Sequence, residues 1–124
     1  LDRIDMHVDV PRLPPAQLRP DAPGGESSAI VRSRVEGARA RALARGGVAN
    51  ARLDHAGTLA ACRLDPPDQA LLERAIDALQ LSARSMQRVL RVARTIADLA
   101  GCAAIGTAHV TEALGYRTRE RAAA

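Results

Sequence analysis

Three arginines are spaced so that they share one face of a predicted helix, an arrangement suited to phosphate. Arg84, Arg88 and Arg91 follow one another at intervals of four and three residues, which makes them neighbours on a helix. A guanidinium group stays charged and offers a planar fork of donors that matches phosphate oxygens. Arg84 lies in the opening turn, where the helix dipole adds to the field on an anion. The alternative, favoured by periodicity alone, is a solvated helix face.

The opposite face of the same segment, residues 82–100, is apolar and is expected to lie in the core. Its apolar residues recur at the helical period of about 100° per residue. Arg94 and Asp98 flank the arginine face and are spaced to form an ion pair one turn apart. The predicted core residues of this helix are Met86, Val89, Leu90, Ala93, Ile96, Ala97 and Ala100.

No other residues have the spacing of a catalytic or metal site. His7, His55 and His109 are far apart in the sequence, and none belongs to a metal-binding motif with a nearby carboxylate. The chain has no lysine and no glycine-rich phosphate loop, so it has no nucleotide-binding loop of its own. We therefore expect no metal site and no cofactor in this chain, and no independent ATPase activity.

The composition predicts an all-α domain. Apolar residues make up 47% of the 124 positions, but there is no Phe or Trp and only one tyrosine, Tyr116. The core must therefore be built from Ala, Leu, Val and Ile, and alanine favours helix because it loses no side-chain entropy there. The length suffices for one domain. We expect a small bundle of four to five helices.

The charge pattern has two interpretations. All eighteen basic residues are arginine, against fourteen acidic residues, which gives a net charge of +4. An excess of positive charge is typical of proteins that bind nucleic acid. The alternative is codon bias in a GC-rich genome, which raises arginine and alanine together. We favour codon bias because the arginines are spread along the chain.

The cysteines and the hydropathy pattern indicate a cytoplasmic location with no membrane partner. Cys62 and Cys102 lack the spacing of a disulfide framework or metal motif, so we expect both thiols to be small core residues. No stretch approaches the roughly 20 consecutive apolar residues that a membrane span needs.

Residues 1–25 predict an extended strand followed by a connector. Alternating apolar residues over 4–10 are typical of a strand, whose sheet would lie in a preceding part of a longer protein. Asp5 and Asp9 fall on the polar side of this strand and are expected to face solvent. Residues 11–25 contain five prolines, which exclude both a helix and a sheet ladder.

Capping residues and glycines divide the rest of the chain into helices. Ser, Asp and Thr mark the starts, and Gly marks the ends. The predicted helices cover about residues 28–45, 50–61, 66–79 and 82–100, with a last helix beginning at Thr107. We assign residues 1–25 to the end of a preceding core with its connector, 26–117 to the helical domain and 118–124 to a disordered tail.

Several of these stretches together resemble the Mg-chelatase-like family of AAA+ ATPases. The resemblance covers the end of the ATPase core and the helical lid that follows it in that family. The longest similar stretch begins at the predicted cap of the arginine helix. The stretches are 1–5 (LDRID), 8–11 (VDVP), 25–28 (GESS), 31–35 (VRSRV), 81–85 (LSARS) and 88–99 (RVLRVARTIADL).

The resemblance implies that this chain is the C-terminal helical lid of a longer ATPase. Arg3 would be the arginine finger that reaches the ATP of a neighbouring subunit, where it stabilises charge in the transition state. Arg84 would be the sensor 2 arginine, through which the loss of the γ-phosphate moves the lid. The full-length protein would bind ATP and Mg²⁺, and the lid would contact its own core and neighbouring subunits of a hexameric ring.

The resemblance also implies a function on DNA. One branch of the family contains a competence protein associated with branch migration of invading strands during natural transformation, so we expect an ATP-driven motor on DNA. One alternative is the lid of a chelatase-type ATPase that drives metal insertion into a porphyrin. Another is a free-standing basic helical module that binds DNA.

Overall fold

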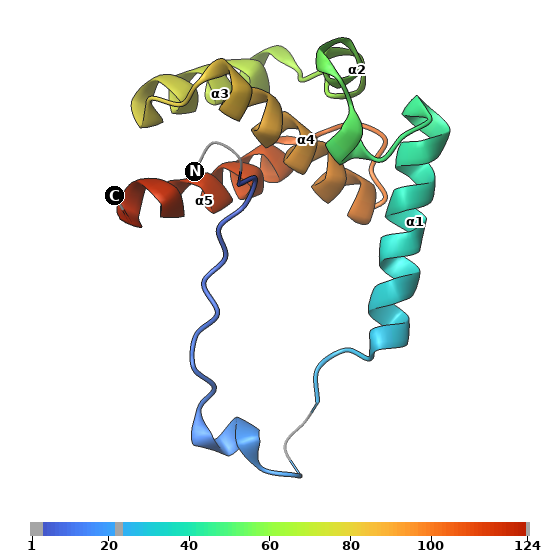
Figure 1. Cartoon of the computed structure of the whole chain (residues 1–124), viewed down its shortest axis with the longest axis vertical. Coiled ribbons are helices and arrows are strands. Elements are labelled where there is room, and N and C mark those ends of the chain that lie inside the picture. Colours follow the sequence, from blue (N-terminus) through green and yellow to red (C-terminus); the bar gives the residue numbers. More distant parts are fainter. Residues whose placement is uncertain (1–3, 22–23, 124) are drawn as a thin grey trace.

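Five α-helices account for most of the chain in the computed structural model, which describes residues 4–21 and 24–123, with side chains described up to Arg117. The described residues contain no β-strand, so the all-α prediction is confirmed. Figure 1 shows the arrangement of the helices. The elements are η1 (Pro15–Leu18), α1 (Ser28–Gly46), η2 (Asn50–Arg52), α2 (His55–Ala61), α3 (Pro66–Leu79), α4 (Ala83–Leu99) and α5 (Thr107–Ala123).

The helix ends follow the capping chemistry of the sequence. Ser27 Oγ accepts the backbone N–H of Ile30 at 3.2 Å and begins α1. Helix α1 ends at Gly47, whose φ of 76° lies in the left-handed region that favours glycine. Ser82 caps α4 in the same way as Ser27 caps α1. The predicted bounds of α1, α3 and α4 are therefore confirmed to within a residue.

The weak helix predicted over residues 50–61 is two elements. The short turn η2 is separated from α2 by Leu53 and Asp54, both in extended backbone conformation. The side chain of Asp54 accepts the backbone N–H of Gly57 at 2.7 Å, which starts a new helix. Leu53 is 9% exposed, so its side chain fixes the break against the bundle.

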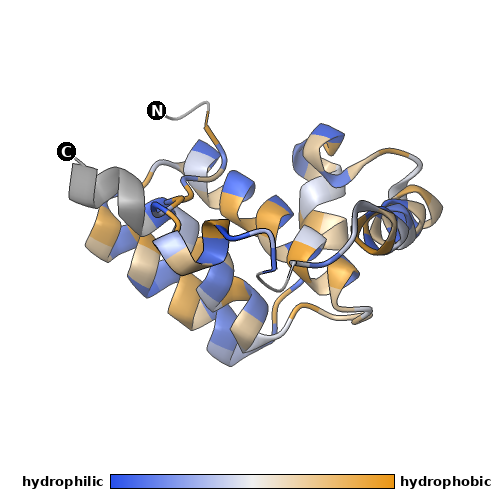
Figure 2. Cartoon of the chain, turned by 90° about the horizontal axis from the view of Figure 1, so that it is seen from below, coloured by the Kyte–Doolittle hydropathy of each residue, from blue (hydrophilic) through white to orange (hydrophobic). Residues whose placement is uncertain are grey.

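Helix α4 is the centre of the bundle, because it contacts α1, α2, η2 and α5. Every helix carries hydrophobic and hydrophilic residues around its axis, as Figure 2 shows. Small side chains line much of the core and let the helices approach closely, in place of the absent Phe and Trp. The buried core cluster consists of Cys62, Leu72, Val89, Leu90, Ala93, Ala97, Ile105, Val110, Ala113 and Leu114.

The predicted apolar face of α4 is largely confirmed, but the buried arc of this helix is wider. Of its predicted core residues, the buried ones are Val89, Leu90, Ala93 and Ala97. Ala100 is exposed because α4 ends at Leu99. Polar residues at both margins of the face are also buried, because α1 packs on one side and α5 on the other. These polar residues are Ser85, Arg94 and Asp98.

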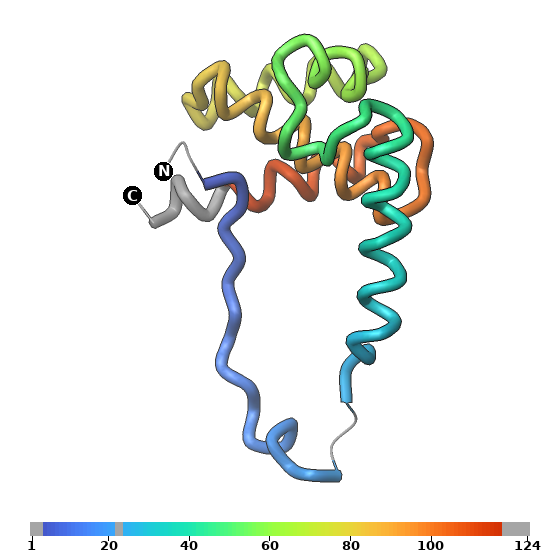
Figure 3. Tube along the Cα trace, turned by 45° about the vertical axis from the view of Figure 1, so that its right-hand side comes forward, coloured from blue at the N-terminus to red at the C-terminus, as the bar shows by residue number. Residues whose placement is uncertain are grey.

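Residues 4–10 do not form a β-strand in the described part of the chain. The sheet expected for this segment would lie in a preceding part of a longer protein, and a strand needs such a ladder partner. This segment lies against α5 instead, where the His7 N–H donates to the Tyr116 carbonyl at 3.1 Å. Figures 1 and 3 show that residues 8–21 and the first half of α1 leave the bundle on the same side. We call residues 4–21 the N-terminal arm.

The last helix is longer than the sequence suggested. Helix α5 runs over Thr107–Ala123, and so includes residues 118–123, which we expected to be part of a disordered tail. Arginine and alanine dominate this segment, and both have high helix propensity. Residue 124 lies outside the described residues.

The two cysteines differ in environment. Cys62 is 4% exposed, and burial raises the pKa of its thiol to about 11, so it stays protonated as an ordinary core residue. Cys102 is exposed, contrary to prediction, because it lies in the loop that follows Gly101 at the end of α4.

The core makes a direct prediction about stability. Leu72 is fully buried, so Leu72→Ala is expected to lower the free energy of unfolding by about 2–5 kcal/mol through lost burial and a residual cavity. Leu59, on α2, is 50% exposed, and Leu59→Ala should change it by less than about 0.5 kcal/mol. Urea denaturation of both variants measures the difference, and equal losses would contradict the assigned core.

Candidate functional site

Arg84 lies exposed in the first turn of α4, one residue after the helix begins. It forms no hydrogen bond or ion pair with the part of the chain that the structure describes. The positive end of the helix dipole adds to its charge at this position. This side chain can therefore meet an anion without first breaking an internal contact.

Arg88 lies one turn further along α4 and does not extend the charged surface of Arg84. Its guanidinium forms an ion pair with Asp5 of the N-terminal arm, and only 18% of the Arg88 side chain is exposed. The expectation that Asp5 simply faces solvent is therefore wrong.

Arg91, the third arginine of the predicted face, turns toward the break between η2 and α2. Its Nη1 atom lies 3.4 Å from Thr58 Oγ1 and 3.5 Å from the Leu53 carbonyl oxygen, both long for hydrogen bonds. The three arginines thus have three different environments, which match neither a continuous phosphate-binding stripe nor a fully solvated face.

Arg3, the predicted arginine finger, lies outside the described residues, but the residue that follows it is firmly held. The Ile4 carbonyl accepts a hydrogen bond of 2.5 Å from Arg117 Nη1. Arg117 Nη2 donates to Ser85 Oγ at 3.1 Å. Arg117 and Ser85 are each 1% exposed, so this bridge is buried at α4 and α5, whereas its arm end at Ile4 is partly exposed.

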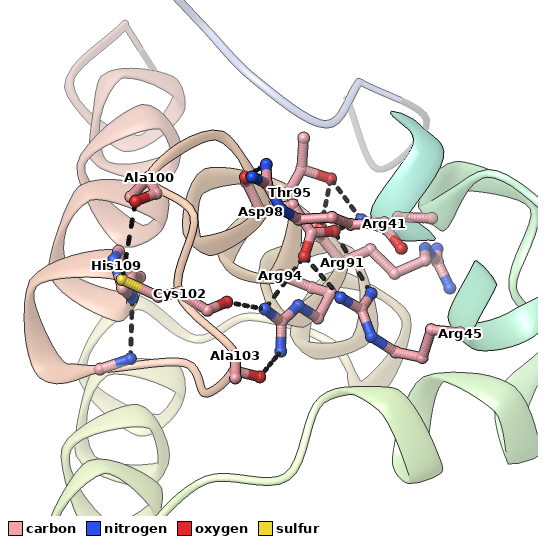
Figure 4. Close-up of polar contacts among 12 residues, drawn as sticks. Arg41, Arg45, Arg91, Arg94, Thr95, Asp98, Ala100, Cys102, Ala103 and His109 are labelled. Carbon is pink, nitrogen blue, oxygen red and sulfur yellow. Dashed lines mark hydrogen bonds and ion pairs between the residues drawn. The ribbon is translucent and has the colours of Figure 1, made fainter. Parts of the chain in front are cut away.

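A second buried network surrounds Asp98, near the other end of α4. Figure 4 shows the Asp98 side chain between Arg45 and Arg94. The carboxylate accepts from Arg45 at 2.5 and 3.3 Å, and from Asn50 Nδ2 at 2.9 Å. Arg94 Nη2 lies 3.0 Å from it, and Arg41 donates to the Asp98 backbone carbonyl at 2.8 Å. The network joins α4 to α1 and η2.

The charge of Asp98 is compensated inside the protein. Its side chain is fully buried, and burial alone would raise the pKa of the carboxyl. Hydrogen bonds from Arg45 and Asn50, together with the positive charges of Arg94 and Arg45, outweigh that effect. The pKa of Asp98 therefore falls below its ordinary value of 3.8, and the group stays ionised.

Arg94 also fixes the loop that joins α4 to α5. Its Nη1 atom donates to the Ala103 carbonyl at 3.0 Å and its Nη2 atom to the Cys102 carbonyl at 2.8 Å. A loop carbonyl held by a cation needs no helix or sheet partner. The predicted Arg94–Asp98 pair is therefore present, but as a buried structural element instead of a surface pair.

Most of the partners in these two networks could not be predicted from the sequence. The spacing of Arg94 and Asp98 indicates a pair, but Arg45 lies 53 residues before Asp98. Ser85 and Arg117 are separated by 32 residues, and no motif connects them. A polar residue at the margin of an apolar helical face is the only local sign of burial.

The described residues offer no cluster of His, Cys, Asp or Glu side chains in which three or more could bind a metal ion. Among the helices of that same part, none has the length and apolar character needed to cross a membrane.

Comparison with known proteins shows where the chain belongs. The family model of the magnesium chelatase subunit ChlI C-terminal region matches residues 25–117. The chain is a member of this family. The resemblance seen in the sequence is thereby confirmed. The matched region contains Arg84 and Asp98 and ends at Arg117, so it includes both networks except for the arm residue Ile4.

Several relatives align with nearly the whole chain. It is 42% identical over 121 residues to the competence protein ComM of Haemophilus influenzae and 41% identical over 121 residues to the uncharacterized protein YifB of Escherichia coli. These alignments cover 98% of the chain. An uncharacterized protein of Mycobacterium tuberculosis is 38% identical over 123 residues, with 94% of the chain covered. The chain spans about a quarter of each relative's length, 24%.

Removing the charge of Asp98 should strongly destabilise the fold. Asp98→Asn keeps the shape but leaves Arg45 and Arg94 without their buried anion, so we expect a loss of about 3–5 kcal/mol in the free energy of unfolding. Asp77→Asn on the exposed surface of α3 should change it by less than about 0.5 kcal/mol. Urea denaturation at neutral pH measures the unfolding free energy of both variants. Similar losses would show that the charge of Asp98 stabilises the fold no more than that of an exposed carboxylate.

The same network predicts a pH dependence. Because the pKa of Asp98 is lower in the folded than in the unfolded state, its ionised form stabilises the fold at pH values above 3.8. That contribution is lost as the pH falls through the lowered folded-state value. The difference in unfolding free energy between wild type and Asp98→Asn should therefore shrink in acid. A difference that stays constant between pH 7 and pH 3 would contradict this assignment.

Proposed function

We propose that this domain is the helical lid of an AAA+ ATPase and couples ATP binding and hydrolysis to motor action on DNA. The observation that carries the proposal is the exposed Arg84, in the first turn of a helix on which Arg88, Arg94 and Asp98 form ion pairs within the protein. Membership in the magnesium chelatase subunit family and the 42% identity to a competence protein support it.

Arg84 has the properties of a γ-phosphate sensor. It is exposed, lies at the positive end of a 17-residue helix and has a planar set of donors for phosphate oxygens. Helix α4 is central to the bundle, so a pull on Arg84 is transmitted to the domain as a whole. Bound ATP with Mg²⁺ supplies the phosphoryl group for hydrolysis. Residues that would hold the metal and the other phosphates do not occur in this sequence, which has no phosphate loop.

The assembly would be a hexameric ring in the cytoplasm. Arg3 would reach the nucleotide of a neighbouring subunit, and Arg84 would report on the γ-phosphate. The name of the Haemophilus influenzae relative, a competence protein, favours DNA as the substrate of the ring. A second candidate is a chelatase-type ATPase that drives metal insertion into a porphyrin. The membership of the chain in the family of a magnesium chelatase subunit supports this candidate.

DNA-stimulated hydrolysis distinguishes the two candidates. A motor on DNA should hydrolyse ATP several-fold faster when the full-length protein is given duplex or branched DNA. A chelatase-type ATPase should be indifferent to DNA and should respond to its porphyrin-binding partner subunits. Hydrolysis that is unaffected by any DNA structure would contradict the motor.

A free-standing DNA-binding module is less well supported by the contacts of the arginines. Several arginines of the matched region donate to carboxylates or carbonyls of the protein itself, which competes with binding to DNA phosphates; among them are Arg41, Arg45, Arg88, Arg94 and Arg117. If the isolated domain were such a module, it should bind duplex DNA at about 50 mM salt and lose affinity steeply as salt rises.

Arg84→Ala is the direct test of the proposed sensor. In the full-length protein the variant should lose roughly 100-fold in the turnover number for ATP, because a positioned cation at the transferred phosphate is removed. Thermal stability should be unchanged, since Arg84 is exposed. Arg74→Ala, also an exposed helical arginine, is the matched control and should turn over normally. Normal turnover in Arg84→Ala would end the sensor assignment.

A further inference from the structure

We infer that Ser85 and Arg117 are positioning residues that hold the first turn of α4 against α5 and so fix the place of Arg84. This inference rests on the proposed function, in which Arg84 binds the γ-phosphate of ATP. Neither Ser85 nor Arg117 touches nucleotide in this assignment. Their role is to keep the turn that carries Arg84 from moving independently of the rest of the domain.

The apolar core of the domain does not reach the first turn of α4. The buried apolar residues of this helix begin at Val89, one turn after Ser85. Met86 packs against the core but is only partly buried. The first turn of a helix frays readily, because its backbone N–H groups have no partner within the helix. The turn that carries Arg84 therefore depends on polar contacts to keep its place.

Ser85 provides these polar contacts. It is the one buried residue among residues 82–88, with an exposure of 1%. Its backbone N–H donates to the Oγ atom of the capping residue Ser82 at 3.1 Å. Its own Oγ atom accepts from Ser82 Oγ at 3.2 Å and from Arg117 Nη2 at 3.1 Å. Ser85 thus joins the cap of α4 to a side chain of α5, at the residue that follows Arg84.

The burial of Arg117 indicates that its position matters more than the volume it fills. Arg117 is 1% exposed and is the largest fully buried side chain in the described part of the chain. A buried cation costs free energy unless polar groups compensate it, and an apolar residue of similar size would fill the same volume at lower cost. Arg117 Nη1 also donates to the Ile4 carbonyl at 2.5 Å. A planar guanidinium that is held at both ends fixes where the Ser85 hydroxyl must lie.

This tether connects Arg84 to the domain as a whole. Helix α5 packs along α4 and also contacts α3. When Arg84 binds an anion, a first turn that is bound to α5 passes the displacement to both helices. A loosely held turn would let Arg84 follow the phosphate alone. Small misplacements of a group that contacts the transition state lower the rate by large factors, so the tether acts on the turnover number.

Ser85→Ala tests the tether in the full-length protein. The variant keeps the backbone N–H that Ser82 caps and loses the hydroxyl that accepts from Arg117. We expect the turnover number for ATP to fall about 10-fold and the KM for ATP to change less than about 2-fold, because a transition-state contact is weakened. Arg117→Met removes the donor and should have the same effect. The double variant should fall no further than either single variant, since both break one contact.

Combination with Arg84→Ala separates positioning from stability. If the tether acts through Arg84, Ser85→Ala should cause no further loss of turnover once residue 84 is alanine. The matched control is Val110→Ala, which opens the buried core of α5. This control should lower the melting temperature and leave the turnover number of the folded protein normal.

Hydrogen exchange gives a second readout on the first turn of α4. The Met86 N–H donates to the Ser82 carbonyl at 3.0 Å, so its exchange reports on opening of this turn. Exchange of the Met86 amide should be several-fold faster in Ser85→Ala than in Val110→Ala. Equal exchange in the two variants would show that the hydroxyl of Ser85 does not hold the turn.

The outcomes distinguish this inference from the proposed function. Normal turnover in Arg84→Ala would overturn the proposed function, and the inference with it. If Arg84→Ala loses turnover but Ser85→Ala keeps it, the sensor assignment stands and the positioning role is wrong. A further loss when Ser85→Ala is added to Arg84→Ala also contradicts the positioning role. If Arg117→Met does not fold, Ser85→Ala decides alone, because it removes a single oxygen atom.

Discussion

The burial of one carboxylate determines how the helices are held around α4. Asp98 is fully buried, and its ionised form needs positive partners from other elements, since an isolated buried charge is prohibitively costly. Arg45 on α1, Asn50 on η2 and Arg94 on α4 itself meet that need. Because these partners come from separate parts of the chain, satisfying Asp98 fixes where α1, η2 and the loop after α4 must lie.

The chain uses arginine where other proteins of this size use aromatic residues. There is no Phe or Trp, and the largest fully buried side chain is Arg117. An arginine stem is apolar and fills volume between helices, while its head satisfies carbonyl groups that would otherwise be unpaired. Arg94 and Arg117 both do this, one on the loop before α5 and the other on the N-terminal arm. The arginine excess is therefore partly structural, which neither codon bias nor DNA binding accounts for.

Local signals predicted the helices well and the polar networks poorly. Caps such as Ser27 and Ser82, and the stop at Gly47, act within a few residues, so the sequence determined the bounds of α1 and α4. The strand over residues 4–10 was predicted from alternation alone, and alternation cannot supply the ladder partner that a strand requires. Arg45 and Arg117 could not be found because their partners are 53 and 32 or more residues away, and only the packed helices bring them together.

The same division of the arginines explains why Arg84 is available. Along α4, Arg88 binds the arm, Arg91 turns toward the η2–α2 break, and Arg94 holds the loop before α5. Each of these positions faces a neighbouring element, whereas the first turn extends beyond them and leaves the Arg84 side chain exposed. Helix α4 is anchored by arginines along its length and has one arginine exposed at its positive end. In the proposed function, the anchored arginines stabilise the helix and Arg84 binds the anion, so stability and sensing use different residues.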